Sequence, residues 1–143
     1  MPNISCIICA YNEAPRIAAV LAATTSCPTL NEVIVIDDAS TDNTAEVVRQ
    51  FPGVTLIVLP KNVGKSRALV QGLKLAQGEL VMVLDADLFN ITQQDVASLA
   101  LPVLSGEADV SISLRHNAFG IHHAIGLDFT SGERVLPKSL LAD

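Results

Sequence analysis

Two carboxylates, Asp85 and Asp87, stand on either side of a small residue directly after an apolar run over residues 80–84. If that run is a strand, side chains two positions apart point the same way, so both carboxylates face one side. Such a pair suits a hard divalent cation, because Mg²⁺ takes one or two protein carboxylates and completes its shell with water and substrate phosphate oxygens. The alternative is two solvated acids in a turn.

A second acidic pair, Asp37 and Asp38, follows the apolar run over residues 33–36. An acid at a strand end can accept hydrogen bonds from a ribose hydroxyl or a base N–H. The alternative is a helix N-cap, since Asp favours that position. Residues 40–42, Ser-Thr-Asp, could cap the helix by themselves, which leaves the acidic pair available for a ligand.

A short loop, residues 61–64, precedes the next helical pattern. Gly64 lets the backbone approach a ligand, and Lys65 at a helix N-terminus favours an anion there. An ordinary helix start remains the alternative. Neither GxxxxGK[ST] nor, after the first strand, GxGxxG is present, which argues against a P-loop and against a dinucleotide-binding Rossmann domain.

Single residues at other positions are weaker candidates. Tyr11, the only tyrosine, follows the first apolar run, where its ring could pack against a nucleobase. Glu13 either binds a ligand or complements the dipole of the helix after it. Arg115 and Arg134 could each pair with a phosphate or form a structural ion pair. The three histidines lie close together in sequence, and we favour solvated or structural roles over metal ligation for His116, His122 and His123.

The three cysteines, Cys6, Cys9 and Cys27, do not indicate a disulfide scaffold. An odd count without an export signal favours a reducing compartment. Cys6 and Cys9 have CxxC spacing, but they lie within an apolar run that reads as a strand, so they should point to opposite faces. We expect buried, inert thiols rather than a redox pair or a zinc site.

The elements that must position these residues alternate regularly along the chain. Apolar runs predict strands at residues 4–9, 33–36, 54–59, 80–84 and 108–114. Helical patterns predict five helices. The first is capped by Asn12, the second follows residues 40–43, and the third runs from the Gly64 loop to Gly78. The fourth extends from a Thr92–Asp95 capping box to about Pro102, and the fifth opens at residues 137–141. The alternation predicts an α/β fold whose mostly parallel sheet is covered on both faces, with ligands beyond the carboxyl ends of the strands.

Length and composition agree with one layered domain. The chain has 143 residues, of which 50% are apolar and 17% charged, with a net charge of −6. Disorder, a coiled coil and a disulfide miniprotein are excluded. An acidic chain without a basic run is a poor nucleic-acid binder. No apolar stretch approaches the roughly 18 residues of a membrane span, and the N-terminus does not look like a signal peptide, so we expect a cytoplasmic protein.

Taken together, three segments resemble the family 2 glycosyltransferases, which have the GT-A fold. They read SCIICAYNEAPRI, NEVIVIDDASTDNTAEVV and KNVGKSRALVQGLKLAQGELVMVLDADL. A fourth, TSGERVLPKSLL, resembles members related to dolichyl-phosphate mannose or glucose synthases and to glucosyl-phosphoglycerate synthases. The resemblance implies a Rossmann-like three-layer sandwich. It also implies inverting, metal-dependent transfer of a sugar from a UDP- or GDP-sugar.

The resemblance also implies roles for the candidate residues. Asp85 and Asp87 would hold Mg²⁺ or Mn²⁺, and Lys65 would lie near the diphosphate. The residues expected to bind the nucleotide sugar are Tyr11, Glu13, Asp37, Asp38, Lys65, Asp85, Ala86 and Arg115. The usual catalytic base of many members lies beyond the SGER-like segment, so the nearest spare acid, Asp128, is the candidate here.

The resemblance divides the chain into a donor-binding core, residues 1–114, and the start of an acceptor-side region, residues 115–143, which we expect to be truncated. An acceptor that is already a phosphate needs little help from a base, so a lipid phosphate or a phosphorylated small molecule is expected. A lipid acceptor would bring the protein to the inner membrane surface.

Several alternatives stay open. A non-catalytic module that binds a nucleotide sugar or a partner protein is one, and a homodimer is another. A nucleotidyltransferase is disfavoured, because no glycine-rich, basic loop follows the first strand.

Overall fold

The fold was analysed in a computed structural model, which describes residues 1–113 and 133–141. The elements follow the alternation expected from the sequence. In chain order they are β1 (Ile4–Ala10), α1 (Ala14–Thr25), β2 (Glu32–Asp37), α2 (Thr44–Arg49), β3 (Thr55–Val58), α3 (Lys65–Leu75), β4 (Leu80–Asp85), α4 (Gln93–Leu104), β5 (Ser111–Ile112), β6 (Arg134–Pro137) and the 3₁₀ helix η1 (Lys138–Leu141).

The strands form one sheet in the order β3-β2-β1-β4-β6-β5. The first four strands of the chain are parallel, and β6 runs antiparallel to both β4 and β5. β4 is buried along its whole length, as expected for an apolar strand inside a covered sheet. The prediction of an α/β fold with a mostly parallel sheet is confirmed, whereas the antiparallel strand β6 was not predicted.

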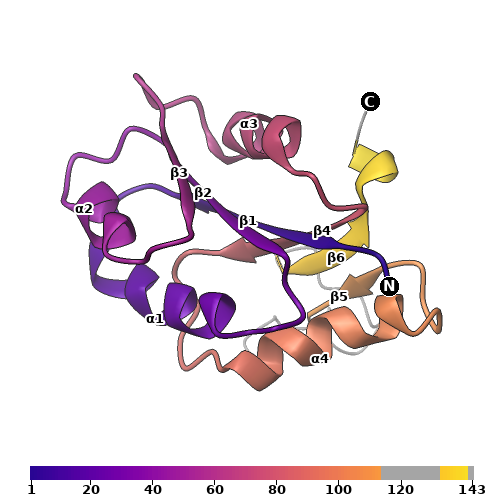
Figure 1. The fold of residues 1–143 in the computed structure, drawn as a ribbon. Helices are drawn as coiled ribbons and strands as arrows, with labels where there is room; N and C mark the ends of the chain where they lie inside the picture. The colour runs from indigo at the N-terminus through magenta and orange to yellow at the C-terminus, as the bar shows by residue number, and fades with distance from the viewer. Residues whose placement is uncertain (114–132, 142–143) are drawn as a thin grey trace, which may run out of the picture.

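Helices cover both faces of the sheet, which gives three layers (Figure 1). α1, α2 and α4 lie on one face, over alternate residues of β1 such as Ile4 and Ile8. α3 lies on the other face, over Ile7 of β1 and Ile34 of β2, with η1 at its side. The period of two along each strand thus sends neighbouring side chains into two separate apolar layers.

One glycine sets the distance between α3 and the sheet. A Cβ atom at Gly72 would lie 2.6 Å from Cγ2 of Ile7, so only a glycine allows this close approach. The contact matters for function because α3 begins at Lys65, the residue expected to face a ligand.

Some boundaries differ from the expectations. Asn12 does not occupy the N-cap of α1, because the N-cap position is Glu13. α3 ends at Leu75 rather than at Gly78. A Cβ at Gly78 would lie 2.7 Å from the backbone nitrogen of Ser5, so the glycine allows the backbone after α3 to pass close to β1.

Three of the remaining elements differ from the predictions, and the helix that follows Thr92 agrees with its predicted start. β3 and β5 are shorter than predicted, and the C-terminal helix opening is the 3₁₀ helix η1. The Thr92–Asp95 capping box is present, and α4 passes through Pro102 to Leu104. Among the described residues, none of the helices has the length and apolarity that crossing a bilayer requires.

Candidate functional site

The carboxyl ends of β1, β2 and β4 meet the start of α3 around a pocket of about 400 Å³. The residues that line it are Cys9, Ala10, Tyr11, Glu13, Asp38, Lys65, Asp85, Ala86 and Asp87. The structure therefore brings together all the described residues that the sequence singled out for nucleotide and metal binding, with the exception of Asp37.

The sheet topology explains this convergence. β1 pairs with β2 on one side and with β4 on the other, so the direction of strand addition reverses at β1. In this register Ala10 stands beside Asp37, and Cys9 stands beside Asp85. A reversal of this kind opens a crevice at the carboxyl ends of the strands, where ligands bind in open α/β sheets.

Asp38 holds the loop that leads into α3. Its Oδ1 accepts a hydrogen bond from the backbone nitrogen of Val63 at 2.8 Å, and its Oδ2 accepts one from that of Gly64 at 2.9 Å. The side-chain nitrogen of Asn62 donates to the backbone oxygen of Asp38 at 3.2 Å. Gly64 has a φ of 90°, which favours glycine. Asp38 therefore positions Lys65 through this loop, independently of any contact that Asp38 makes with a ligand.

Asp37 lies outside the pocket and stabilises a turn. It is 1% exposed, and its Oδ1 accepts a hydrogen bond from the backbone nitrogen of Ser40 at 3.0 Å. The turn includes Ala39 in the left-handed region, with a φ of 62°. Of the two neighbouring acids, Asp38 is therefore the one that lines the pocket.

A network that sequence reasoning missed joins the loops after β1 and β2. The backbone nitrogen of Asn12 donates to Oγ of Ser40 at 2.9 Å. Oδ1 of Asn12 accepts from the backbone nitrogen of Thr41 at 2.8 Å, and the backbone nitrogen of Glu13 donates to Oγ1 of Thr44 at 3.0 Å. Asn12 and the Ser-Thr-Asp cluster were visible in the sequence only as candidate helix caps.

Asp42 completes this network. Its Oδ1 accepts from the backbone nitrogen of Thr44 at 2.9 Å, and its Oδ2 accepts from that of Ala14 at 3.3 Å. The side-chain hydrogen bond from Thr44 is the main cause that lowers the pKa of Asp42. The two loops are thereby held as one unit, which determines where Tyr11 and Glu13 lie.

Tyr11 and Glu13 differ in their surroundings. The ring of Tyr11 is half exposed at the pocket, as a side chain available for stacking would be. The carboxylate of Glu13 forms an ion pair with Nε of Arg16 at 2.6 Å. Glu13 makes no side-chain cap to α1. Its charge at the pocket is therefore partly neutralised from within its own helix.

Asp85 and Asp87 both face the pocket. Asp85 is buried and its Oδ1 forms an ion pair with Nζ of Lys65, while Asp87 is exposed. Within residues 1–113 and 133–141, no histidine, cysteine or further acid joins these two carboxylates to form a group of three metal-ligating residues. Two carboxylates are nevertheless the usual protein share of a Mg²⁺ site that substrate phosphates complete, so the donor set fits a hard cation.

The cysteines are free, as expected, but one lies at the site. Cys6 is fully buried, and burial raises the pKa of its thiol. Cys9 is only partly buried and lines the pocket. Burial raises the pKa of Cys9 to about 11; the positive charge of Lys65 opposes this shift, and the charges of Asp38 and Asp85 add to it.

A second cavity of about 700 Å³ adjoins the first, since Asp87 lines both. It lies between the end of β4, α4 and β5. Half of its described lining residues are apolar. The other half are three serines, one asparagine and three acids, Asp87, Asp95 and the buried Glu133, and no described lysine or arginine lines it. Phe89, 89% exposed, stands at its rim.

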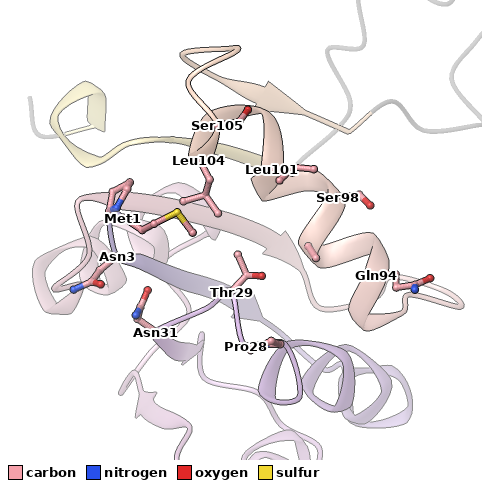
Figure 2. Close-up of a pocket in the computed structure, with 12 residues that line it drawn as sticks. Met1, Asn3, Pro28, Thr29, Asn31, Gln94, Ser98, Leu101, Leu104 and Ser105 are labelled. Atoms are coloured by element: carbon pink, nitrogen blue, oxygen red, sulfur yellow. The ribbon is translucent and has the colours of Figure 1, made fainter.

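A third cavity, of about 830 Å³, lies at the amino end of the sheet and away from these acids. Figure 2 shows it between α4 and the turn that contains Pro28 and Thr29, with Met1 at one side. None of the described residues that line it has an acidic or basic side chain. Its size therefore does not make it the candidate for nucleotide chemistry. The remaining candidates, Arg115, His116, His122, His123 and Asp128, lie outside the described residues.

A three-layer sandwich with an acidic, lysine-bearing pocket at the switch point of its sheet defines a doubly wound α/β domain, a class in which ligands bind at that position. The family follows from the sequence profile of Glycosyl transferase family 2, which matches residues 5–128. The chain belongs to this family.

Relatives of this chain include transferases that are named after a lipid phosphate. This chain is 34% identical over 123 residues to an undecaprenyl-phosphate 4-deoxy-4-formamido-L-arabinose transferase of Aeromonas hydrophila. The matched segment covers 80% of this chain and 37% of that protein. It is also 37% identical over 94 residues to a dolichyl-phosphate beta-glucosyltransferase of Trichomonas vaginalis, and this matched segment covers 57% of this chain and 28% of that protein. The chain thus spans well under half the length of these relatives.

The fold is of the GT-A type found in a solved relative. Glucosyl-3-phosphoglycerate synthase from Mycobacterium tuberculosis, crystallised with Mn²⁺, UDP-glucose and phosphoglyceric acid, superposes with a TM-score of 0.84 at 26% identity. The match covers 98% of this chain and 58% of that one. The expected three-layer GT-A architecture is confirmed.

Proposed function

We propose that this chain is the donor-binding part of an inverting glycosyltransferase, which takes a sugar from a UDP- or GDP-sugar with the help of Mg²⁺ or Mn²⁺. The observation that carries the proposal is the single pocket at the switch point, where Asp38, Lys65, Asp85 and Asp87 converge. Residues 1–114 form the donor core in this proposal, and residues 115–143 begin the acceptor side.

The nucleotide end of the donor is assigned to the loops after β1 and β2. The exposed ring of Tyr11 offers a stacking surface for the base. Glu13 and Asp38 supply acceptors for base or ribose hydrogens, with Asp38 also holding the loop before Lys65, whereas Asp37 supports the turn that follows β2. A carboxylate has about four lone-pair sites, so two backbone bonds leave Asp38 capacity for a ligand.

The diphosphate end is assigned to Lys65, Asp85, Ala86 and Asp87. The two carboxylates would hold the divalent cation, which supplies charge stabilisation to the departing diphosphate. Lys65 adds a positive charge at the N-terminus of α3, where backbone N–H groups also favour an anion. Arg115 remains a further predicted phosphate contact.

As the acceptor we propose a lipid phosphate or a phosphorylated small molecule, the two kinds of compound that appear with the relatives described above. Asp128 remains the predicted base. The cytoplasm or the inner membrane surface, and a homodimer, likewise remain predictions.

Calorimetric titration of UDP and GDP, with and without Mn²⁺, tests the donor site. We expect one nucleotide to bind in a Mn²⁺-dependent manner, and Asp85→Ala to reduce that affinity at least tenfold, because a charged partner of the cation is lost. Asp109→Ala, a change at an exposed acid remote from the pocket, is the matched control and should bind as the wild type does. Equal, metal-independent affinity in all three proteins would contradict the assignment.

The second candidate is a module that binds a nucleotide sugar without transferring it. A donor-hydrolysis or transfer assay on the chain distinguishes the two, because the module would bind the nucleotide but release no sugar.

A further inference from the structure

The ion pair between Lys65 and Asp85 joins two elements of the candidate site. Asp85 ends β4, and Lys65 begins α3. Nζ of Lys65 lies against Oδ1 of Asp85, whose side chain is 9% exposed, while that of Lys65 is 56% exposed. A nearly buried acid is therefore neutralised by a cation that reaches in from the solvent side.

Charge balance explains why the lysine lies there. The pocket is lined by four acids, Glu13, Asp38, Asp85 and Asp87, and Lys65 is the one cation among the described residues that line it. Glu13 has its own counter-ion in Arg16. An ionised carboxylate removed from water is costly without a partner, so the buried Asp85 requires a positive charge close by.

The same lysine is free to move its charge without moving its backbone. The preceding residue, Gly64, is held by the carboxylate of Asp38, and the helix that follows packs on β1 through Gly72. The ammonium group stands at the end of a flexible four-carbon stem. A change of side-chain rotamer can therefore carry the charge from Asp85 to another anion in the pocket.

We propose that Lys65 is the resident counter-ion of Asp85 and competes with the divalent cation for that carboxylate. This inference rests on the proposed function, since it assigns Asp85 to the cation. When cation and nucleotide bind together, Lys65 leaves Asp85 and pairs with the diphosphate. Each ligand then removes an obstacle to the other, so their binding is cooperative, and the coupling is equal in both directions.

The test measures Mn²⁺ binding in the absence of any nucleotide, by electron paramagnetic resonance or calorimetry. Lys65→Met removes the charge and keeps an unbranched apolar stem. We expect its Mn²⁺ affinity to rise about tenfold, because a competing cation is gone. With Mn²⁺ present, its UDP affinity should fall about tenfold. Lys65→Arg, which keeps the charge, should stay within about twofold of the wild type in Mn²⁺ affinity.

Lys61→Met is the matched control, because it removes the same formal charge from an exposed position in the same loop. If Lys65→Met and Lys61→Met raise the Mn²⁺ affinity equally, the effect is general electrostatics and the proposal is overturned. Unchanged or weaker Mn²⁺ binding by Lys65→Met, or no Mn²⁺ binding by this variant, also overturns it. Circular dichroism of each variant shows that it is folded.

The outcome separates this inference from the proposed function. If UDP and GDP fail to bind the wild type while Lys65→Met still gains Mn²⁺ affinity, the donor assignment fails and the competition at Asp85 stands. If a nucleotide binds with Mn²⁺ but Lys65→Met leaves the Mn²⁺ affinity unchanged, the donor assignment stands and the competition fails.

Discussion

At the scale of single residues, the acids of the site differ in what they hold. Asp37 stabilises a turn, Asp38 binds two backbone nitrogens of the loop before α3, and Asp85 pairs with Lys65. Asp87 is exposed between two cavities. Four acids that look alike in sequence thus divide into residues that shape the pocket and residues that present charge to it.

Asp38→Asn tests the shaping role. The amide keeps one acceptor, but its NH₂ group must face the backbone N–H of Val63 or of Gly64, which leaves a partly buried donor unsatisfied. We expect a loss of about 1–3 kcal/mol in the free energy of unfolding by urea, together with weaker nucleotide binding. Asp109→Asn, at an exposed acid, should change stability by less than about 0.5 kcal/mol. Equal stability of the two variants would refute the role.

Cys9 offers a test that depends on pH. The thiolate is the reactive form, and the pKa of Cys9 is raised to about 11. Alkylation should therefore keep increasing about tenfold per pH unit from pH 8 to pH 10, whereas a small-molecule thiol levels off near its own pKa. Mass spectrometry after digestion assigns the label to Cys9. A plateau below pH 9.5 in the folded protein would show that the pKa is not raised.

At the scale of elements, α3 connects the packing of the core with the charge at the site. It rests on β1 through Gly72 and Ile7, and it begins with Lys65. Gly72 lies about two helical turns after Lys65, and its lack of a side chain lets α3 approach β1 closely. This close approach fixes the position of the N-terminus of α3. A change in the core can therefore displace a charge in the pocket.

Gly72→Ala tests this connection. Alanine favours a helix over glycine by about 1 kcal/mol, but its Cβ would lie 2.6 Å from a methyl group of Ile7, which is fully buried. Overpacking of this kind costs about 1–3 kcal/mol, so we expect lower stability and weaker nucleotide binding. Ser66→Ala, at an exposed position of α3, is the control and should change stability by less than about 0.5 kcal/mol. A Gly72→Ala protein as stable as the wild type would contradict the close contact.

At the scale of the whole molecule, topology decides that distant segments share a pocket. Tyr11 and Asp38 follow β1 and β2, Asp85 ends β4, and Lys65 begins α3. The reversal at β1 places these four residues at one edge of the sheet. The cavity of about 830 Å³ at the opposite edge includes no described acidic or basic side chain in its lining. The chemistry is therefore located by the ends of the strands and not by the size of the cavity.

Much of this architecture could be predicted from the sequence. Apolar runs marked the parallel strands, since burial on both faces requires them, and the rule of strand ends named the acids that line the pocket. The resemblance to family 2 glycosyltransferases rested on the same segments, and the family match includes them. Local patterns suffice here because the apolar run of a strand and its polar end are both set by consecutive residues.

Contacts between distant residues could be decided only by the tertiary structure. Asn12 looked like a helix cap, yet it binds the loop after β2, some thirty positions away. The antiparallel β6, four residues between β4 and β5, has too short a pattern to predict its partners. The clamp of Asp38 on Gly64 and the ion pair of Lys65 with Asp85 join separate strands and helices. Their partners depend on how the layers pack, and no local pattern encodes that packing.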